Sequence, residues 1–241
     1  MHTDIDVIVL SGGFGTRLRS LSPGRQKTVA PIGANTVLGY VLDLVERIGI
    51  SRVVLALGYR ADDVVTFLGS RTCRGTDYLF SIEPEPLGTA GAIRYALPLV
   101  RSSNVLVLNG DSFVGINLNC LLSYHHEKRA RISMLSVKMK DTSRYGRVMI
   151  DPDGSVRSFY EKNERAIGVG WINAGIYVFE REVITAIPAA QQVSLEHDIL
   201  PKYCADGLYA LKTQAPFIDV GTPESFQAAE AFFKQYDLDT R

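Results

Sequence analysis

The sequence has no net charge and no long apolar run. It carries 26 Lys+Arg against 26 Asp+Glu, so its overall charge attracts neither a polyanion nor an acidic membrane. Any anion site must therefore be a local cluster, and we expect neither nucleic acid nor a membrane as partner. The first ten residues, MHTDIDVIVL, lack a basic segment followed by a long apolar one, and no window approaches the roughly 20 apolar residues that span a bilayer. These absences predict a soluble, cytoplasmic protein.

Cysteine and histidine are scarce. The three cysteines, Cys73, Cys120 and Cys204, are widely spaced and odd in number, which argues against a disulfide framework or a thiolate metal site and predicts reduced, buried thiols. No His, Ser and Cys arrangement suggests a nucleophilic triad. His125 and His126 lie in a polar helical stretch, so we expect both at the surface.

Aliphatic and β-branched runs are present, and in the first half they alternate with helical patterns. This alternation predicts an α/β fold: a Rossmann-like, mixed but mainly parallel sheet flanked by helices, formed by residues 1–241 as a single domain. Ligands of such sheets bind beyond the carboxyl ends of the strands, here after Leu10, Ile82, Leu108 and Val220. The expected strands are Val7–Leu10, Val53–Leu57, Tyr78–Ile82, Val105–Leu108, Ile132–Val137, Ile172–Phe179 and Phe217–Val220, and the expected helices are Thr36–Ile48, Ala61–Leu68, Thr89–Leu97 and Leu118–Lys128.

The second half predicts a β-rich insertion. Tyr145–Ile150 and Val156–Tyr160 flank the turn sequence DPDG, as expected of a β-hairpin. Helices are expected over Ser194–Tyr203, with Ser194 as N-cap, and over Glu224–Tyr236, which follows Thr222-Pro223.

The segment SGGFGTR, residues 11–17, follows the first expected strand. Gly12, Gly13 and Gly15 would let backbone N–H groups approach a ligand. The spacing is neither that of a dinucleotide fold nor that of a P-loop. Taken alone, the segment is equally well explained as an ordinary turn with solvated arginines.

Further motifs occur in a fixed order: Lys27 and Pro31 in RQKTVAPI, then PLGTAGAI, LNGD, the pair Glu161-Lys162 and DVGTPE. With GGFGTRL, this series resembles the sugar-1-phosphate nucleotidyltransferases, over essentially the whole chain. LNGDSF, SRYGRV, INAGIY and SLEHDIL look most like the D-glycero-D-manno-heptose 1-phosphate guanylyltransferase branch. The resemblance implies a GT-A-like fold with a β-rich sugar-binding insertion. The nucleotide-binding half would comprise about residues 1–115, and the sugar-phosphate-binding half about residues 116–241.

By this resemblance, Arg17, Lys27 and Lys162 are the catalytic cations. Arg17 and Lys27 would contact the triphosphate, and Lys162 the phosphate of the sugar. A surface ion pair is the less favoured alternative for Glu161-Lys162. The relatives usually have Pro-Lys-Pro where this chain has Gln26-Lys27-Thr28, so we expect a looser loop, with Arg25 as a substitute cation. The implied nucleotide-binding residues are Leu10, Ser11, Gly12, Gly13, Gly15, Thr16, Arg17, Glu83, Gly88, Thr89, Asn109 and Gly110.

The implied reaction is attack by a sugar 1-phosphate on the α-phosphorus of a nucleoside triphosphate. The phosphate is largely ionised at neutral pH, so cations and in-line positioning are needed rather than a general base. Asp111 and Asp219 each come at the end of an apolar strand, and the resemblance makes them ligands of Mg²⁺. Capping of a turn is the alternative for each, and is the more plausible for Asp219.

Glu83 could accept two hydrogen bonds from guanine, which favours GTP, with Glu85 as the alternate. The sugar pocket by resemblance comprises Gly146, Glu161, Lys162, Asn173 and Gly175. Trp171 could floor this pocket or fill a core gap. His197 could line the pocket, but we favour a structural role for it.

The leading hypothesis is a guanylyltransferase making GDP-heptose for bacterial lipopolysaccharide or capsule. The alternatives are a mannose-1-phosphate guanylyltransferase, a uridylyltransferase for a hexosamine or muramic-type 1-phosphate, and a non-catalytic regulator that binds nucleotide sugars. The chain leaves no room for a further carboxy-terminal domain, so we expect that any homo-oligomer uses the catalytic domain itself.

Overall fold

The computed structural model describes residues 5–16, 24–72, 75–160 and 168–239. Within them, a nine-stranded sheet runs in the order β10-β9-β11-β6-β1-β4-β5, with β8 beside β11 and β12 beside β8. The four neighbouring strands β6, β1, β4 and β5 are mutually parallel. Strand β11 runs antiparallel to β6, β8 and β9. The strands are β1 Asp6–Ser11, β4 Arg52–Leu57, β5 Asp77–Ile82, β6 Asn104–Asn109, β8 Ile132–Met139, β9 Arg147–Ile150, β10 Val156–Tyr160, β11 Gly170–Glu180 and β12 Leu208–Thr213.

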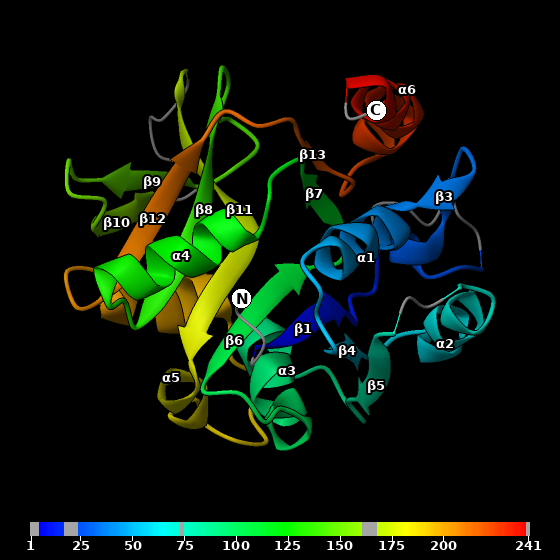
Figure 1. The fold of residues 1–241 in the computed structure, drawn as a ribbon, viewed down its shortest axis with the longest axis horizontal. Helices are drawn as coiled ribbons and strands as arrows, with labels where there is room; N and C mark the ends of the chain where they lie inside the picture. Colours follow the sequence, from blue (N-terminus) through cyan, green and yellow to red (C-terminus); the bar gives the residue numbers. More distant parts are fainter. Residues whose placement is uncertain (1–4, 17–23, 73–74, 161–167, 240–241) are drawn as a thin grey trace.

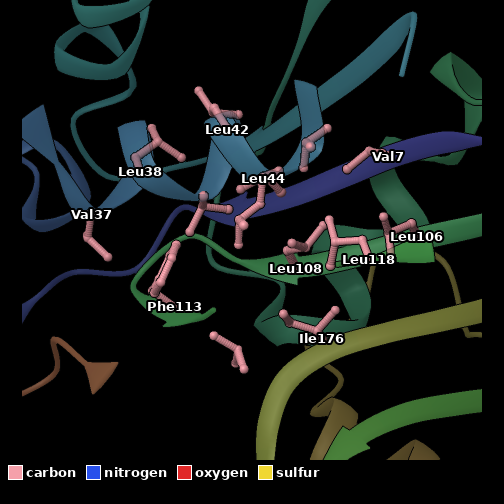
Figure 2. Close-up of a cluster of buried hydrophobic side chains, with 14 of the residues drawn as sticks. Val7, Val37, Leu38, Leu42, Leu44, Leu106, Leu108, Phe113, Leu118 and Ile176 are labelled. Carbon is pink, nitrogen blue, oxygen red and sulfur yellow. The ribbon is translucent and has the colours of Figure 1, made fainter. Parts of the chain in front are cut away.

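Helices cover both faces of this sheet (Figure 1). Strand β1 is buried on both sides: Val7 and Val9 pack in one apolar cluster with α1, α2, α4 and α6, whereas Ile8 packs in the other with α3 and α5. Figure 2 shows part of the first cluster, which includes α1 residues such as Leu42 and Leu44 together with Val7 of β1 and Leu106 of β6. The mixed α/β architecture predicted from the alternating patterns is confirmed. The helices are α1 Val37–Arg47, α2 Ala61–Gly69, α3 Gly88–Ala96, α4 Asn119–Lys128, α5 Arg181–Thr185 and α6 Pro223–Asp239.

Two small antiparallel sheets flank the main one. Strand β2 (Pro31–Ile32) pairs with β3 (Asn35–Thr36). Strand β7 (Ser112–Val114) pairs with β13 (Phe217–Asp219), which leads directly into α6. The second pairing brings the end of the chain back to the first half of the molecule.

The second half contains the predicted hairpin. Strands β9 and β10 pair across DPDG, where the Gly154 N–H donates to Asp151 O at 3.0 Å. The helix expected over Ser194–Tyr203 is instead one wide turn, Leu195–Ile199, followed by a 3₁₀ turn, Leu200–Tyr203. Ser194 caps the first turn as predicted, because its side chain accepts from the His197 N–H at 3.2 Å.

Two expectations about single residues are wrong. Cys120 is exposed and Cys204 is half-buried, so neither is a fully buried thiol; Cys73 lies outside the described residues. His125 is buried at 5% exposure rather than exposed, and its Nδ1 lies 2.9 Å from the Ser133 hydroxyl of β8. A polar helical stretch can therefore still turn one polar side chain inward, where a neighbouring strand offers it a partner.

Candidate active site

The loops that follow the parallel strands line two adjoining cavities, of about 360 Å³ and about 670 Å³. The loops after β1 and β6 contribute to both, and the residue after β5, Glu83, contributes to the smaller. This is the sheet edge at which the sequence predicted a ligand site. Five residues line both cavities and so mark their junction: Gly13, Phe14, Lys27, Asn109 and Asp111.

Most of the predicted nucleotide-binding residues gather around the smaller cavity. Gly15 and Thr16 line the larger one instead. Gly110 lines neither cavity, and its N–H donates to Leu10 O at 2.9 Å. Arg17 lies outside the described residues. The residues that do line the smaller cavity are Leu10, Ser11, Gly12, Gly13, Glu83, Gly88, Thr89 and Asn109.

Glu83 is fixed at the wall of the smaller cavity. Its Oε2 accepts from the Leu87 N–H at 3.2 Å. Its Oε1 packs so closely against Gly58 that a Cβ added to this glycine would lie only 2.7 Å from the oxygen. Partial burial raises the pKa of the Glu83 carboxyl, and the Leu87 N–H acts in the opposite direction. The alternate residue, Glu85, is exposed and lines neither cavity.

The Gln26-Lys27-Thr28 segment is not loose, contrary to the expectation from its missing prolines. The Gln26 side chain is 1% exposed, and its Nε2 donates to Ser11 O at 2.9 Å. Its Oε1 accepts from the Thr28 N–H at 2.6 Å and from the Thr28 hydroxyl at 2.9 Å. The segment forms a 3₁₀ turn, Lys27–Val29, anchored to the glycine loop. Lys27 is thereby positioned at the junction, whereas Arg25 is exposed and lines neither cavity.

Asp111 and Asp219 are brought together by the β7–β13 pairing. Asp219 lies opposite Ser112 in the register, and the Val220 N–H donates to Asp111 O at 2.9 Å. Both aspartates line the larger cavity, and Asp111 is ion-paired with the Lys27 ammonium. Burial raises the pKa of Tyr145, which also lines the larger cavity, and the negative charge of Asp219 raises this pKa further.

These two carboxylates suit a magnesium ion. The ion prefers oxygen ligands, keeps several waters and is usually held by one or two carboxylates together with substrate phosphates. The residues that the structure describes contain no group of three or more His, Cys, Asp or Glu arranged for a metal. A site completed by substrate oxygens and water is the one that this donor set fits.

The predicted sugar residues lie around the larger cavity. Gly146, Asn173 and Gly175 line it, and a bulge in β11 between Asn173 and Tyr177 shapes this wall. Gly175 has φ +74°, and its N–H donates to Asn173 Oδ1 at 3.0 Å. Glu161 and Lys162 lie outside the described residues.

Sequence reasoning missed several residues that line the larger cavity. Tyr145 and Phe217, whose rings meet edge to face at 5.8 Å, come from segments more than 70 positions apart. His197, which was considered for this pocket although a structural role was favoured, also lines the cavity. Trp171 belongs to neither cavity and lies 5.9 Å from the Lys138 and Lys212 ammonium groups. The further lining residues not predicted are Phe14, Ser112, Phe159, Tyr160, Ala174, Ser194, Glu196 and Gly221.

Known proteins resemble this chain in sequence and in structure. The chain is 33% identical to the D-glycero-alpha-D-manno-heptose 1-phosphate guanylyltransferase of Aneurinibacillus thermoaerophilus, over 96% of this chain and 100% of that enzyme. It is 34% identical to the mannose-1-phosphate guanylyltransferase of Mycobacterium tuberculosis, over 94% of this chain but only 64% of that enzyme. HddC from Yersinia pseudotuberculosis, crystallised with GMP-PN, superposes with a TM-score of 0.83 at 34% identity, covering 95% of this chain and 99% of that one.

No helix within the described ranges has both the length and the apolar character needed to cross a bilayer.

The family model described as Nucleotidyl transferase matches residues 6–236, which is nearly the whole chain. Because this match spans both cavities and agrees with the relatives above, the chain belongs to the nucleotidyl transferase family of enzymes.

Proposed function

We propose that this protein transfers GMP from GTP to a manno-configured sugar 1-phosphate and releases pyrophosphate. The observation that carries the proposal is the junction of two cavities, one lined by the nucleotide set and the other by the sugar set, at Lys27 and Asp111. The names of the relatives point to the same two substrates. D-glycero-D-manno-heptose 1-phosphate is the leading acceptor, on the local motifs LNGDSF and SLEHDIL, and mannose 1-phosphate is the alternative. GDP-heptose would then serve a bacterial surface polysaccharide.

Glu83 supports guanine as the base. Guanine presents the N1–H and an amino group side by side, and a carboxylate can accept both hydrogen bonds. The backbone contacts of Glu83 fix the direction of its carboxylate at the cavity wall. The base would therefore meet an acceptor that is already oriented.

Lys27 supports the transfer step. The phosphate of the sugar needs no deprotonation near neutral pH, so the protein has to hold two anions together and offset the charge that develops on the pyrophosphate. Lys27 lines both cavities and is fixed by the Gln26 contacts. We therefore expect Lys27 to contact the triphosphate, near the point where the incoming oxygen attacks.

Asp111 and Asp219 would hold Mg²⁺. When bound by these residues, the ion would supply positive charge for the phosphate oxygens. The Lys27–Asp111 ion pair shows that the Asp111 carboxylate already accepts a cation at the junction. The pairing of β7 with β13 positions the two aspartates relative to each other.

A substrate matrix tests the proposal. Pyrophosphate release is measured with Mg²⁺, each of the four common nucleoside triphosphates, and the 1-phosphates of manno-heptose, mannose, glucose and N-acetylglucosamine. We expect the highest kcat/KM for GTP with one of the two manno-configured acceptors. Preference for UTP with the amino sugar would indicate the uridylyltransferase alternative. Binding of GTP or a GDP-sugar without any pyrophosphate release would indicate the regulator.

Asp111→Asn tests the metal site. The amide keeps the size of the side chain but loses the charge, so we expect kcat to fall by about a hundredfold or more while the unfolding midpoint changes little. The control is Asp62→Asn on the exposed side of α2, which should retain kcat. Near wild-type turnover of Asp111→Asn at saturating Mg²⁺ would rule out the assignment of Asp111 as a ligand.

A further inference from the structure

Glu196, in the turn Leu195–Ile199, links the two cavities. It lines the larger cavity, and its Oε2 accepts from the Thr89 hydroxyl at 3.2 Å. Thr89 belongs to the first turn of α3 and lines the smaller cavity. A side chain of the sugar compartment is thus bonded directly to a residue of the nucleotide compartment that lies 107 positions away in the sequence.

The hydrogen-bond directions fix the Glu196 carboxylate. The Thr89 hydroxyl accepts from the Leu195 N–H at 2.8 Å, which leaves its single proton for Glu196. The Ser194 hydroxyl reaches the same oxygen, Oε2, at 3.4 Å. In the described part of the chain no donor reaches Oε1. One carboxylate oxygen is therefore held by the protein, and the other remains to accept from a ligand.

Hydroxyl groups are the ligand that this position suits. A carboxylate at a cavity wall attracts hydrogen-bond donors and repels a phosphate. Lys27, the cation at the junction, belongs to the 3₁₀ turn Lys27–Val29 and not to the turn that carries Glu196. The Tyr177 hydroxyl accepts from Asn173 Nδ2 at 2.6 Å, and burial together with Glu196 holds the pKa of Tyr177 well above 10. Glu196 therefore shares a neighbourhood with Asn173, which lines the same cavity.

We infer that Glu196 binds ring hydroxyls of the sugar 1-phosphate and helps to select the sugar, and that Thr89 is a positioning residue for its carboxylate. This inference rests on the proposed function, since it assumes that the larger cavity receives a sugar. It predicts that loss of the Glu196 charge weakens sugar binding far more than GTP binding. It also predicts that the Thr89 hydroxyl contributes to sugar binding although Thr89 lines the other cavity.

Four variants test the inference: Glu196→Gln, Thr89→Val, the double variant, and Glu182→Gln as a control at an exposed position of α5. KM values for mannose 1-phosphate and GTP, and kcat, come from pyrophosphate release. We expect Glu196→Gln to raise the KM for mannose 1-phosphate by roughly 10- to 100-fold, because hydrogen bonds to a charged group are lost, with less than a threefold change in the KM for GTP. Thr89→Val should raise the sugar KM by a smaller factor, and the double variant should be no worse than Glu196→Gln.

Deoxy analogues identify the hydroxyl. At least one of the 2-, 3- and 4-deoxy derivatives of mannose 1-phosphate should bind wild type and Glu196→Gln equally, since the missing hydroxyl removes the contact from both. Binding is measured by calorimetry in the presence of a GTP analogue with a methylene bridge between the α- and β-phosphates, so that the result does not depend on turnover.

The outcomes separate this inference from the proposed function. If wild type uses none of the sugar phosphates and binds none by calorimetry, both are overturned. If wild type turns over but Glu196→Gln keeps the sugar KM, or loses affinity equally for every deoxy analogue, the role of Glu196 is overturned and the proposed function stands. Additive effects of the Thr89 and Glu196 variants would overturn the positioning role of Thr89 alone.

Discussion

At the scale of single residues, the most informative contact is the anchoring of Lys27 by its neighbour Gln26. The Gln26 side-chain amide is almost fully buried, and both its N–H donor and its oxygen acceptor are hydrogen-bonded. A buried amide with these partners fixes a backbone turn without proline, because each backbone group that it satisfies would cost free energy if left unpaired. The segment is thus stabilised by hydrogen bonds rather than by restriction of the unfolded chain.

Gln26→Met tests this anchor. Methionine fills a similar volume but bonds to neither Ser11 O nor the Thr28 N–H, so we expect the free energy of unfolding to fall by about 2–3 kcal/mol. Release of Lys27 should lower kcat at least tenfold at temperatures where the variant stays folded. Urea unfolding and pyrophosphate release provide the two measurements. A destabilised variant with wild-type kcat would show that Lys27 needs no help from Gln26.

His125→Gln tests the effect of a buried histidine on stability. Burial, and secondarily His126, lower the pKa of His125 to about 4 from 6.5. The unfolded state therefore binds more protons between these two values, and stability that is present above pH 6.5 is lost as the pH falls toward 4. Glutamine can still bond to Ser133 but does not titrate there.

Relative to His125→Gln, the wild type should lose roughly 2 kcal/mol of unfolding free energy between pH 8 and pH 5. Urea unfolding at both pH values gives this difference directly. His126→Gln, at an exposed position, is the matched control. Parallel pH profiles for wild type and His125→Gln would contradict a neutral, buried His125.

The residues could be predicted from the sequence only where one pattern holds the information. The glycine loop, Asp111 and the Asn173–Gly175 segment are recognisable because each is a short contiguous motif. Gln26 was not, because its amide bonds to Ser11 O across 15 positions. His125 was misplaced for the same reason, since its partner Ser133 lies on a different element.

At the scale of elements, the amino-terminal end of α3 joins the wall of the smaller cavity to the segment before Glu196. Gly88 begins the helix with φ +72°, and its backbone packs against the segment before Glu196: a Cβ added there would lie 2.5 Å from Val193 O. The Ala90 N–H donates to the same carbonyl at 3.0 Å. The free N–H groups of the first helical turn are thus partly satisfied by a tertiary contact rather than by a capping side chain.

Gly88→Ala tests this junction. The methyl group meets both an unfavourable positive φ and the Val193 carbonyl, so we expect a loss of about 2 kcal/mol or more in unfolding free energy and a higher KM for GTP. Gly69→Ala at the end of α2 is the control: its Cβ meets nothing within 4 Å, and it should leave the KM unchanged and stability equal or up to about 1 kcal/mol higher. Equal behaviour of the two variants would contradict the close packing at Gly88.

The longer elements were predictable because burial imposes a period on their residues. Strands β1, β4 and β6 are nearly continuous apolar runs, as expected of parallel strands covered on both faces. Strand β12 was missed because it reads LYALKT, in which only Leu208 and Ala210 are buried, so the sequence shows neither a long apolar run nor a clear apolar–polar alternation. Strand β7 has three residues and exists through its pairing with β13, which no local pattern shows.

At the scale of the whole molecule, the carboxy-terminal segment closes the active site against the first half of the chain. After β13, helix α6 lies beside α1 (Figure 1), where the Phe233 and Tyr40 rings stack at 3.7 Å. Phe233 also meets Phe113 of β7 edge to face at 5.1 Å. The strands that carry or follow the two aspartates, β7 and β13, are therefore clamped by one aromatic cluster.

Phe233→Ala tests whether this clamp positions the aspartates. Phe233 is 1% exposed, so its truncation should lower the unfolding free energy by about 3–5 kcal/mol. Because α6 follows Asp219 by only a few residues, loosening the helix should also let β13 shift against β7, and the Mg²⁺ concentration for half-maximal turnover should rise severalfold at a temperature where the variant is folded. Phe233→Leu, which keeps most of the apolar contact, should show a smaller change in both quantities. A large loss of stability with an unchanged Mg²⁺ requirement would mean that the β7–β13 pairing alone holds the two carboxylates, and that α6 contributes to the fold without contributing to the site.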